Sequence, residues 1–187
     1  ECKAIVCVSE KVQRQILKNY NLRSEVIYPG INYKFWSQGK SKKSNNLSLL
    51  TVGRLTKEKN YDIAIKAFAL VSKQVKKARL LIAGDGPYRE NLKLLAKNFS
   101  ISEKVSFLGF QRPEKLRNLY ASSDLVISPS YKTEGFNLTP LEALCSQTVS
   151  VVAKGSGIDE ILEKEGIGLV VKPEPEDFAK AIIDAYK

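Results

Sequence analysis

The sequence predicts an α/β protein with a doubly wound, parallel, six-stranded sheet of the Rossmann-like kind. Three observations support this fold class: apolar runs of strand length alternate with helical patterns, glycines follow most of these runs, and prolines open several of the helical segments. The six expected strands cover residues 47–52, 79–83, 105–108, 124–128, 148–153 and 168–171.

The segments between the strands carry apolar residues at helical spacing. We expect helices over residues 60–75, 87–98, 113–121, 140–144, 158–164 and 175–186. A helix after each strand returns the chain to the start of the next parallel strand, which gives repeated β–α–β units.

Residues 1–46 have a different pattern. They contain the apolar string AIVCVS, a short helical segment over residues 10–19, the string EVIYPG and a polar, lysine-rich stretch. We interpret them as the end of a preceding domain followed by an interdomain linker, and residues 47–187 as a domain of their own. The chain has no methionine, even at position 1, so we expect it to be a piece of a longer protein.

Composition limits the function classes. Thirty Lys and Arg against twenty Asp and Glu give a net charge of +10, which suits acidic partners such as phosphorylated ligands. The sequence shows no interleaving of aromatic and basic residues of the kind that indicates nucleic-acid binding. Three cysteines (Cys2, Cys7 and Cys145) and no histidine argue against a disulfide framework and a zinc site. The apolar runs are too short to span a membrane, so we expect a soluble, cytoplasmic protein, with peripheral contact at the inner face of a membrane left open.

Glycines stand where the expected strands end. Ligands of open parallel sheets bind beyond the carboxyl ends of the strands, where glycine lets the backbone approach a ligand closely. Each glycine alone is explained by a tight turn, but their common edge predicts a ligand crevice. The glycines in question are Gly53, Gly84, Gly86, Gly109, Gly135, Gly155 and Gly157.

The string TEGFNLTPLEAL, residues 133–144, places two carboxylates, Glu134 and Glu142, eight positions apart around an expected helix start. Between them lies a turn whose backbone N–H groups would be free, and Thr139 followed by Pro140 is typical of an N-cap. A helix N-terminus attracts phosphate. The structural alternative is that Thr139 and Glu142 form only a capping box and that Glu134 is a solvated loop acid.

This string resembles the Glu-x7-Glu motif of retaining glycosyltransferases with the GT-B fold, family 4 (glycosyl transferases group 1). The strings VGRLTKEKN, IAGDGPYRENL, VSFLGF and DLVISPS follow the order of that family, and the resemblance covers about residues 47–187. It implies that this is the C-terminal, donor-binding domain of such an enzyme and that residues 1–46 end its acceptor domain.

The resemblance also implies roles for single residues. Arg54 and Lys59 would hold the pyrophosphate of a nucleotide-sugar donor, and Glu134 would contact the transferred sugar. Glu142 would bind the ribose hydroxyls, and the backbone near Phe110 would border the base. Glycines of the crevice (Gly53 and Gly84) and the amides of the acidic motif (Gly135, Phe136, Asn137 and Leu138) would complete the donor site.

Other enzyme classes fit less well. The chain has no Asp-x-Asp pair, so we expect no metal and no cofactor beyond the donor substrate. It has no Gly-x-Gly-x-x-Gly for a dehydrogenase. Glu134 and Glu142 are not expected to be a glycosidase pair, because nothing in the sequence supplies a raised carboxylate pKa or a position for water. The loop SVVAKGSGIDEIL departs from the family at Ser150, Lys154 and Ser156, which leaves the contacts of that loop open.

We therefore expect a retaining glycosyltransferase with GDP-mannose as the favoured donor and UDP-sugars next. The acceptor, a glycan or a lipid-linked sugar, would be bound by the missing N-terminal domain, so this piece alone is expected to be inactive. Three alternatives remain: another GT-B nucleotide-sugar enzyme such as an epimerase, a non-catalytic nucleotide-binding module, and a nucleic-acid-binding module.

Overall fold

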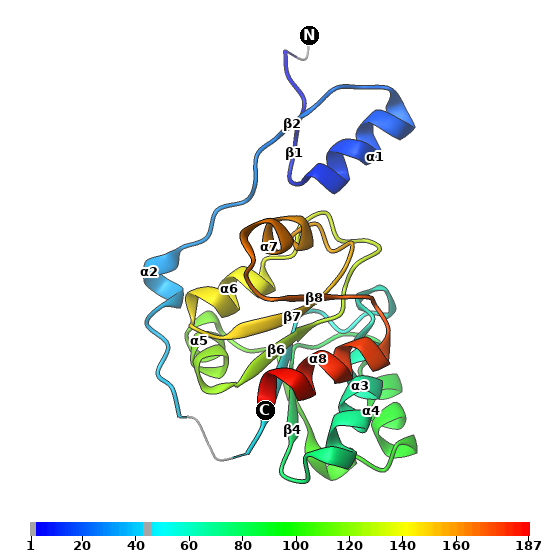
Figure 1. The fold of residues 1–187 in the computed structure, drawn as a ribbon, viewed down its shortest axis with the longest axis vertical. Coiled ribbons are helices and arrows are strands. Elements are labelled where there is room, and N and C mark those ends of the chain that lie inside the picture. The colour runs from blue at the N-terminus through cyan, green and yellow to red at the C-terminus, as the bar shows by residue number, and fades with distance from the viewer. Residues whose placement is uncertain (1–2, 43–45) are drawn as a thin grey trace.

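The computed structural model describes residues 3–42 and 46–187; Cys2 and residues 43–45 of the expected linker lie outside the described residues. It confirms the parallel six-stranded sheet (Figure 1). The strand order is β5-β4-β3-β6-β7-β8, and every neighbouring pair is parallel. The strands are β3 (Ser48–Val52), β4 (Arg79–Ala83), β5 (Val105–Gly109), β6 (Leu125–Ser128), β7 (Val149–Ala153) and β8 (Leu169–Val171).

All six helices expected between and after the strands are present, and each end lies within two residues of its expected position. They are α3 (Tyr61–Gln74), α4 (Arg89–Asn98), α5 (Pro113–Ser122), α6 (Thr139–Cys145), α7 (Asp159–Glu165) and α8 (Pro175–Tyr186), with short 3-10 turns at η1 (Lys57–Lys59) and η2 (Ser102–Lys104). Side chains alternate across the sheet, so neighbouring strand residues enter different cores. Leu49 packs with α3 and α8 residues, whereas Leu50 packs with Tyr120 of α5 and Ala143 of α6. The sheet is therefore covered by helices on both faces.

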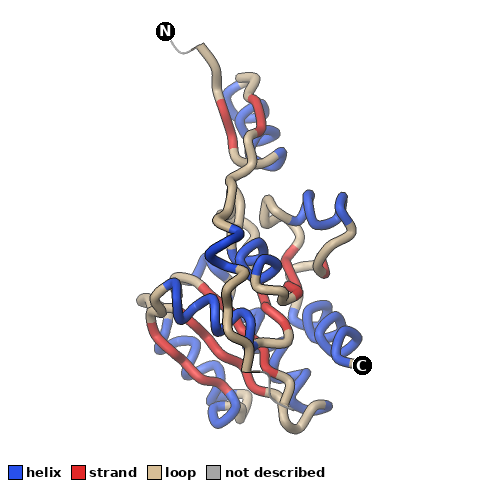
Figure 2. Tube along the Cα trace, turned by 90° about the vertical axis from the view of Figure 1, so that its left-hand side faces the viewer, coloured by secondary structure: helices blue, strands red, loops and turns tan. Residues whose placement is uncertain are grey.

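The N-terminal residues form a separate β–α–β unit. Strands β1 (Val6–Cys7) and β2 (Glu25–Val26) pair in parallel around helix α1 (Glu10–Tyr20). Figure 2 shows this unit standing beyond one end of the main sheet. Within the described residues, no helix is long and apolar enough to cross a membrane.

A helix that the sequence did not predict, α2 (Tyr33–Trp36), lies between this unit and the sheet. The Trp36 ring meets the Tyr120 ring of α5 edge-on, with centroids 5.6 Å apart. The Ser146 hydroxyl, at the end of α6, donates to the Trp36 carbonyl over 3.1 Å. The segment before residue 47 thus packs on the larger domain, while the boundary at residues 46 and 47 stays a prediction.

The direction of winding changes between β3 and β6. From β3 the chain adds β4 and β5 on one side, and it then crosses over to add β6, β7 and β8 on the other. The loops after β3 and β6 consequently separate at the carboxyl edge, and such a switch point opens a crevice for ligands in doubly wound sheets. The site is built around this crevice.

Glycine is required where the loops after β3 and β4 cross. A Cβ on Gly84, whose φ is +146°, would lie 1.8 Å from the Gly53 carbonyl oxygen. Gly109, with a φ of +68°, has open space around the same position. We predict that Gly84→Ala lowers the free energy of unfolding by more than about 3 kcal/mol, because the backbone must shift.

Gly109→Ala is the matched control. Its free energy of unfolding should fall by only about 1–2 kcal/mol, because alanine is strained in the left-handed conformation but meets no neighbouring atom there. Urea unfolding of both variants measures the difference. Equal losses would contradict the close crossing of the two loops.

Candidate functional site

A cleft of about 390 Å³ opens at the carboxyl ends of β3, β4 and β5. This volume lies within the range of small-molecule sites. Phe110, 78% exposed, presents its ring at this edge, and Arg54 is also exposed there. The lining residues are Val52, Gly53, Arg54, Ala83, Gly84, Asp85, Phe110, Gln111 and Leu116. The cleft thus joins four of the predicted site residues: Gly53, Arg54, Gly84 and Phe110.

An ion pair crosses the switch point. The Lys59 ammonium at the end of η1 contacts Glu134 Oε1 in the loop after β6, and the two side chains are 26% and 12% exposed. The Ser130 hydroxyl also donates to Glu134 Oε1, over 2.6 Å. Lys59 and Glu134 come from segments 75 residues apart, so the fold brings these two predicted residues together. Ser130 was not predicted.

Arg54 differs from Lys59 in its surroundings. It is exposed and forms no ion pair with any residue of the described chain. Its backbone position is held by the neighbouring residue, because the Leu55 amide donates to the Asp85 carbonyl over 2.9 Å. The guanidinium therefore remains available to an anion at the mouth of the cleft.

The turn after Glu134 presents backbone donors. Within the described residues, none of the amides of Gly135, Phe136, Asn137 and Leu138 donates to another protein group. The Phe136 side chain packs against the apolar cluster formed by Val152, Ile158 and Leu162, and its ring centroid is 5.9 Å from that of Tyr28. Only the backbone of this turn can thus contribute polar contacts, apart from the Asn137 amide.

The start of α6 corrects the expected N-cap. Thr139 is the first helical residue instead of the cap, and its amide donates to Asn137 Oδ1 over 3.1 Å. The Asn137 side chain also donates to the Ser128 hydroxyl at the end of β6, over 2.8 Å. Thr139 as N-cap is therefore wrong, and the alternative of a capping box with Glu142 is not formed either, because the Asn137 side chain accepts from the Thr139 amide.

Glu142 instead bonds to a buried tyrosine. The Tyr120 hydroxyl of α5 donates to Glu142 Oε2 over 2.7 Å, and Tyr120 is fully buried. Burial raises the pKa of the Glu142 carboxyl, and the hydrogen bond from Tyr120 opposes that shift. Burial and the Glu142 charge raise the pKa of Tyr120 well above its ordinary value. Tyr120 aims the second acid of the motif, a role that no sequence pattern indicated.

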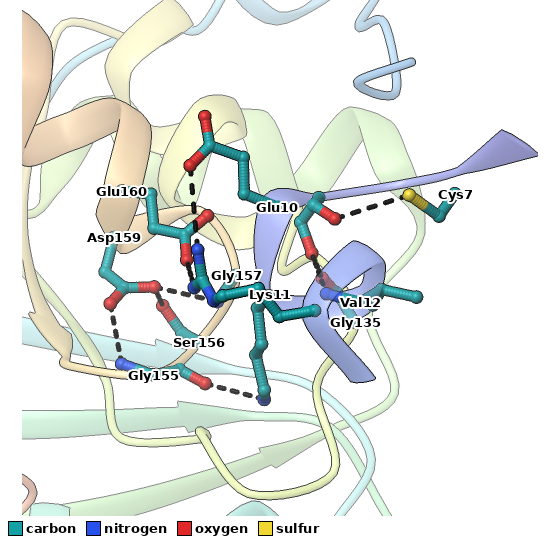
Figure 3. Close-up of polar contacts among 12 residues, drawn as sticks. Cys7, Glu10, Lys11, Val12, Gly135, Gly155, Ser156, Gly157, Asp159 and Glu160 are labelled. Atoms are coloured by element: carbon teal, nitrogen blue, oxygen red, sulfur yellow. Dashed lines mark hydrogen bonds and ion pairs between the residues drawn. The ribbon is translucent and has the colours of Figure 1, made fainter. Parts of the chain in front are cut away.

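The glycine-rich loop after β7 is organised by Asp159, the first residue of α7 (Figure 3). Its carboxylate accepts from the Gly155 amide over 2.7 Å and from the Gly157 amide over 2.8 Å. A Cβ on Gly157 would lie 2.2 Å from the Gly135 carbonyl oxygen, so this loop packs directly on the acidic motif. Lys154, which departs from the family pattern, pairs with Glu163 of α7 over 3.1 Å.

The carboxylates of the site are dispersed. Among the described residues, no group of three or more Cys, Asp and Glu side chains is arranged to hold a metal ion. The expectation that a donor binds without metal stays a prediction.

Comparisons with known proteins place the chain in a family. The family model described as glycosyl transferases group 1 matches residues 32–187. Alpha-monoglucosyldiacylglycerol synthase of Streptococcus pneumoniae is 32% identical over 97% of this chain and 44% of its own length. The O-antigen chain mannosyltransferase RfbU of Salmonella typhimurium is 30% identical over 94% of this chain and 48% of its own. The chain spans about half the length of these relatives.

Solved structures share the fold. HepE of Anabaena, determined in complex with UDP and glucose, superposes with a TM-score of 0.86 at 22% identity, covering 100% of this chain and 54% of that one. A glycosyltransferase from Rickettsia africae gives a TM-score of 0.85 at 22% identity, covering 98% and 53%. The chain therefore belongs to the glycosyl transferases group 1 family, and its doubly wound sheet is that of a GT-B, family-4-like glycosyltransferase domain.

Proposed function

We propose that this chain binds a nucleotide-diphosphate sugar and presents it for retaining transfer to an acceptor hydroxyl held by a domain outside the chain. The observation that carries the proposal is the Lys59–Glu134 pair at the switch point, beside a cleft with Arg54 at its mouth. The base would enter the cleft near Phe110, and the diphosphate would lie between Arg54 and Lys59. The sugar would then reach Glu134 and the free amides of residues 135–138.

The chemistry follows from these groups. The bond between the anomeric carbon and the diphosphate oxygen breaks, a bond to the acceptor oxygen forms, and the acceptor proton passes to the departing diphosphate. Negative charge grows on the diphosphate during this step. A guanidinium, an ammonium and backbone amides stabilise that charge when they are fixed in place beforehand. No metal is needed for this neutralisation.

The sugar and the base belong to the proposal as well. The form of the acidic motif favours GDP-mannose, with UDP-sugars second. The relatives' names include a mannosyltransferase and a glucosyl-lipid synthase, so a test must compare both donors.

The first experiment is calorimetry of the 187-residue chain with GDP-mannose, UDP-glucose, GDP and UDP. We expect one nucleotide sugar to bind with the same Kd, within about twofold, in EDTA and in magnesium, because Arg54 and Lys59 would neutralise the diphosphate. A contribution of about 1.4 kcal/mol from the metal would change the Kd tenfold. Binding only with a divalent ion would contradict the metal-free site. Binding of an oligonucleotide in place of the nucleotides would favour the nucleic-acid alternative, and its affinity would fall steeply with salt.

The same chain should transfer no sugar to an acceptor, because the domain that orients the acceptor supplies the proximity that the reaction needs. Transfer by the chain alone would contradict the two-domain proposal. In the full-length protein, sugar conversion without an acceptor would favour an epimerase, and binding without turnover would favour a non-catalytic module.

Removing either positively charged side chain should weaken the binding of a nucleoside diphosphate. We predict that Arg54→Ala and Lys59→Ala each reduce nucleoside diphosphate affinity by about 1–3 kcal/mol, the range of charge-assisted hydrogen bonds. Lys66→Ala is the control, since Lys66 pairs with Asp62 within α3 and neither residue lines the cleft. Its affinity should stay within about twofold of the parent. A parent-like affinity in both Arg54→Ala and Lys59→Ala would contradict the proposal that these two side chains bind the diphosphate.

The Glu142 carboxylate should lower the stability of the fold at neutral pH while it strengthens donor binding. Its pKa is raised in the folded chain, so its contribution to stability is present below pH 4.5 and is lost as pH rises through the folded pKa. At pH 7 the buried carboxylate is therefore a cost. We predict that Glu142→Gln melts at or above the parent at pH 7 and that the difference shrinks toward pH 4.

The same variant should bind donor at least about tenfold more weakly, because a neutral amide replaces the charged acceptor facing the ribose hydroxyls. Melting curves across pH and calorimetry of the same samples measure both effects. A variant that binds like the parent would leave Glu142 with a structural role alone.

A further inference from the structure

Lys11, in the first turn of α1, contacts backbone carbonyls of two distant loops, and Figure 3 shows its contact with Gly155. Its ammonium donates to the carbonyls of Tyr131 and Glu134, each over 2.6 Å, and to the Gly155 carbonyl over 2.7 Å. A fourth carbonyl, that of Lys132, lies farther away at 3.4 Å. An ammonium has three protons, and the three short contacts account for them. Lys11 thus ties the acidic motif to the glycine-rich loop.

Ser9 extends this contact. Its hydroxyl caps α1 by accepting from the Val12 amide and donates to the Gly135 carbonyl over 2.6 Å. The backbone is also close, because a Cβ on Gly135 would lie 3.3 Å from a Val8 methyl group. Two consecutive carbonyls of the acidic motif, those of Glu134 and Gly135, are therefore held by side chains at the start of α1.

These bonds orient the donors of the motif. In a planar trans peptide, the C=O of one residue and the N–H of the next point in opposite directions. A Glu134 carbonyl that faces Lys11 directs the Gly135 N–H away from α1, and the Gly135 carbonyl on Ser9 does the same for the Phe136 N–H. Within the described chain, neither N–H has a protein acceptor.

We propose that Lys11, assisted by Ser9, is a positioning residue that orients the Gly135 and Phe136 amides and the Glu134 backbone toward the sugar end of the donor. This inference rests on the proposed function and adds to it a dependence on α1, which lies outside residues 47–187. Glu134 is then held at two points: Lys59 and Ser130 bind its carboxylate, and Lys11 binds its carbonyl.

The choice of acceptors supports a positioning role. Asp159, Glu134 and Glu160 lie near enough to oppose the lowering of the Lys11 pKa by burial, yet the short bonds of the ammonium go to neutral carbonyls. An ion pair would serve stability equally well. A carbonyl cage fixes the path of two loops, which is what a donor site requires.

The test compares Lys11→Met with the control Lys18→Met, in the last turn of the same helix. Helix α1 contributes no buried residue, so both variants should fold. We expect Lys11→Met to bind the nucleotide sugar at least about tenfold more weakly than the parent does, which is 1.4 kcal/mol. Its affinity for the matching nucleoside diphosphate should fall by less than about threefold. Amide NMR signals of residues 131–136 and 155–157 should shift or broaden in Lys11→Met alone.

Lys11→Arg separates geometry from charge. Its planar fork cannot make three convergent bonds, so we expect it to bind the nucleotide sugar as weakly as Lys11→Met. Parent-like binding by Lys11→Arg would overturn the inference, because charge alone would then suffice. Unchanged amide signals in Lys11→Met would also overturn it. If the parent bound no nucleotide sugar, the proposed function would fail, and the amide signals would still decide whether Lys11 orders the two loops.

Discussion

The site depends on the reversal of strand order between β3 and β6. Because the chain winds away from this point in both directions, the loops after the two strands face each other with no helix between their strands. Lys59 lies at the end of one loop and Glu134 lies in the other, and their ion pair connects the two loops. A sheet wound in one direction only would bury these loop ends beside a neighbouring crossover.

In the proposed function, that ion pair would also determine how the site responds to a donor. In the structure, the Lys59 charge is largely neutralised by Glu134, whereas Arg54 is unpaired among the described residues. A diphosphate would meet Arg54 first and then compete with Glu134 for Lys59. Glu134 would keep its Ser130 bond and gain freedom to accept from a sugar hydroxyl. The pair is therefore a resting arrangement of two groups that act on different parts of the proposed donor.

Local sequence patterns sufficed for the sheet and for most of the helices. Strand segments such as residues 80–83 are continuous apolar runs, and proline and glycine mark many helix starts and strand ends. The failure at α6 is instructive: Thr139 is a good cap by type, but Asn137 bonds to its amide first. Contacts of Tyr120 with Glu142, and of Lys11 with Glu134, join residues 22 and 123 positions apart. No local pattern encodes such pairs, because tertiary packing creates them.

The charges of the site share one physical feature. Glu142, Lys59, Glu134 and Lys11 are each withdrawn in part from water, and each would be costly alone. Every one is matched by a group from another segment: the Tyr120 hydroxyl, the opposite charge across the switch point, or the carbonyls of two loops. A charged group that is held in this way cannot relax easily, so it keeps its orientation. Removing one of these four charged side chains should therefore disturb binding more than it disturbs the fold, because none of the four belongs to the apolar cores on the two faces of the sheet.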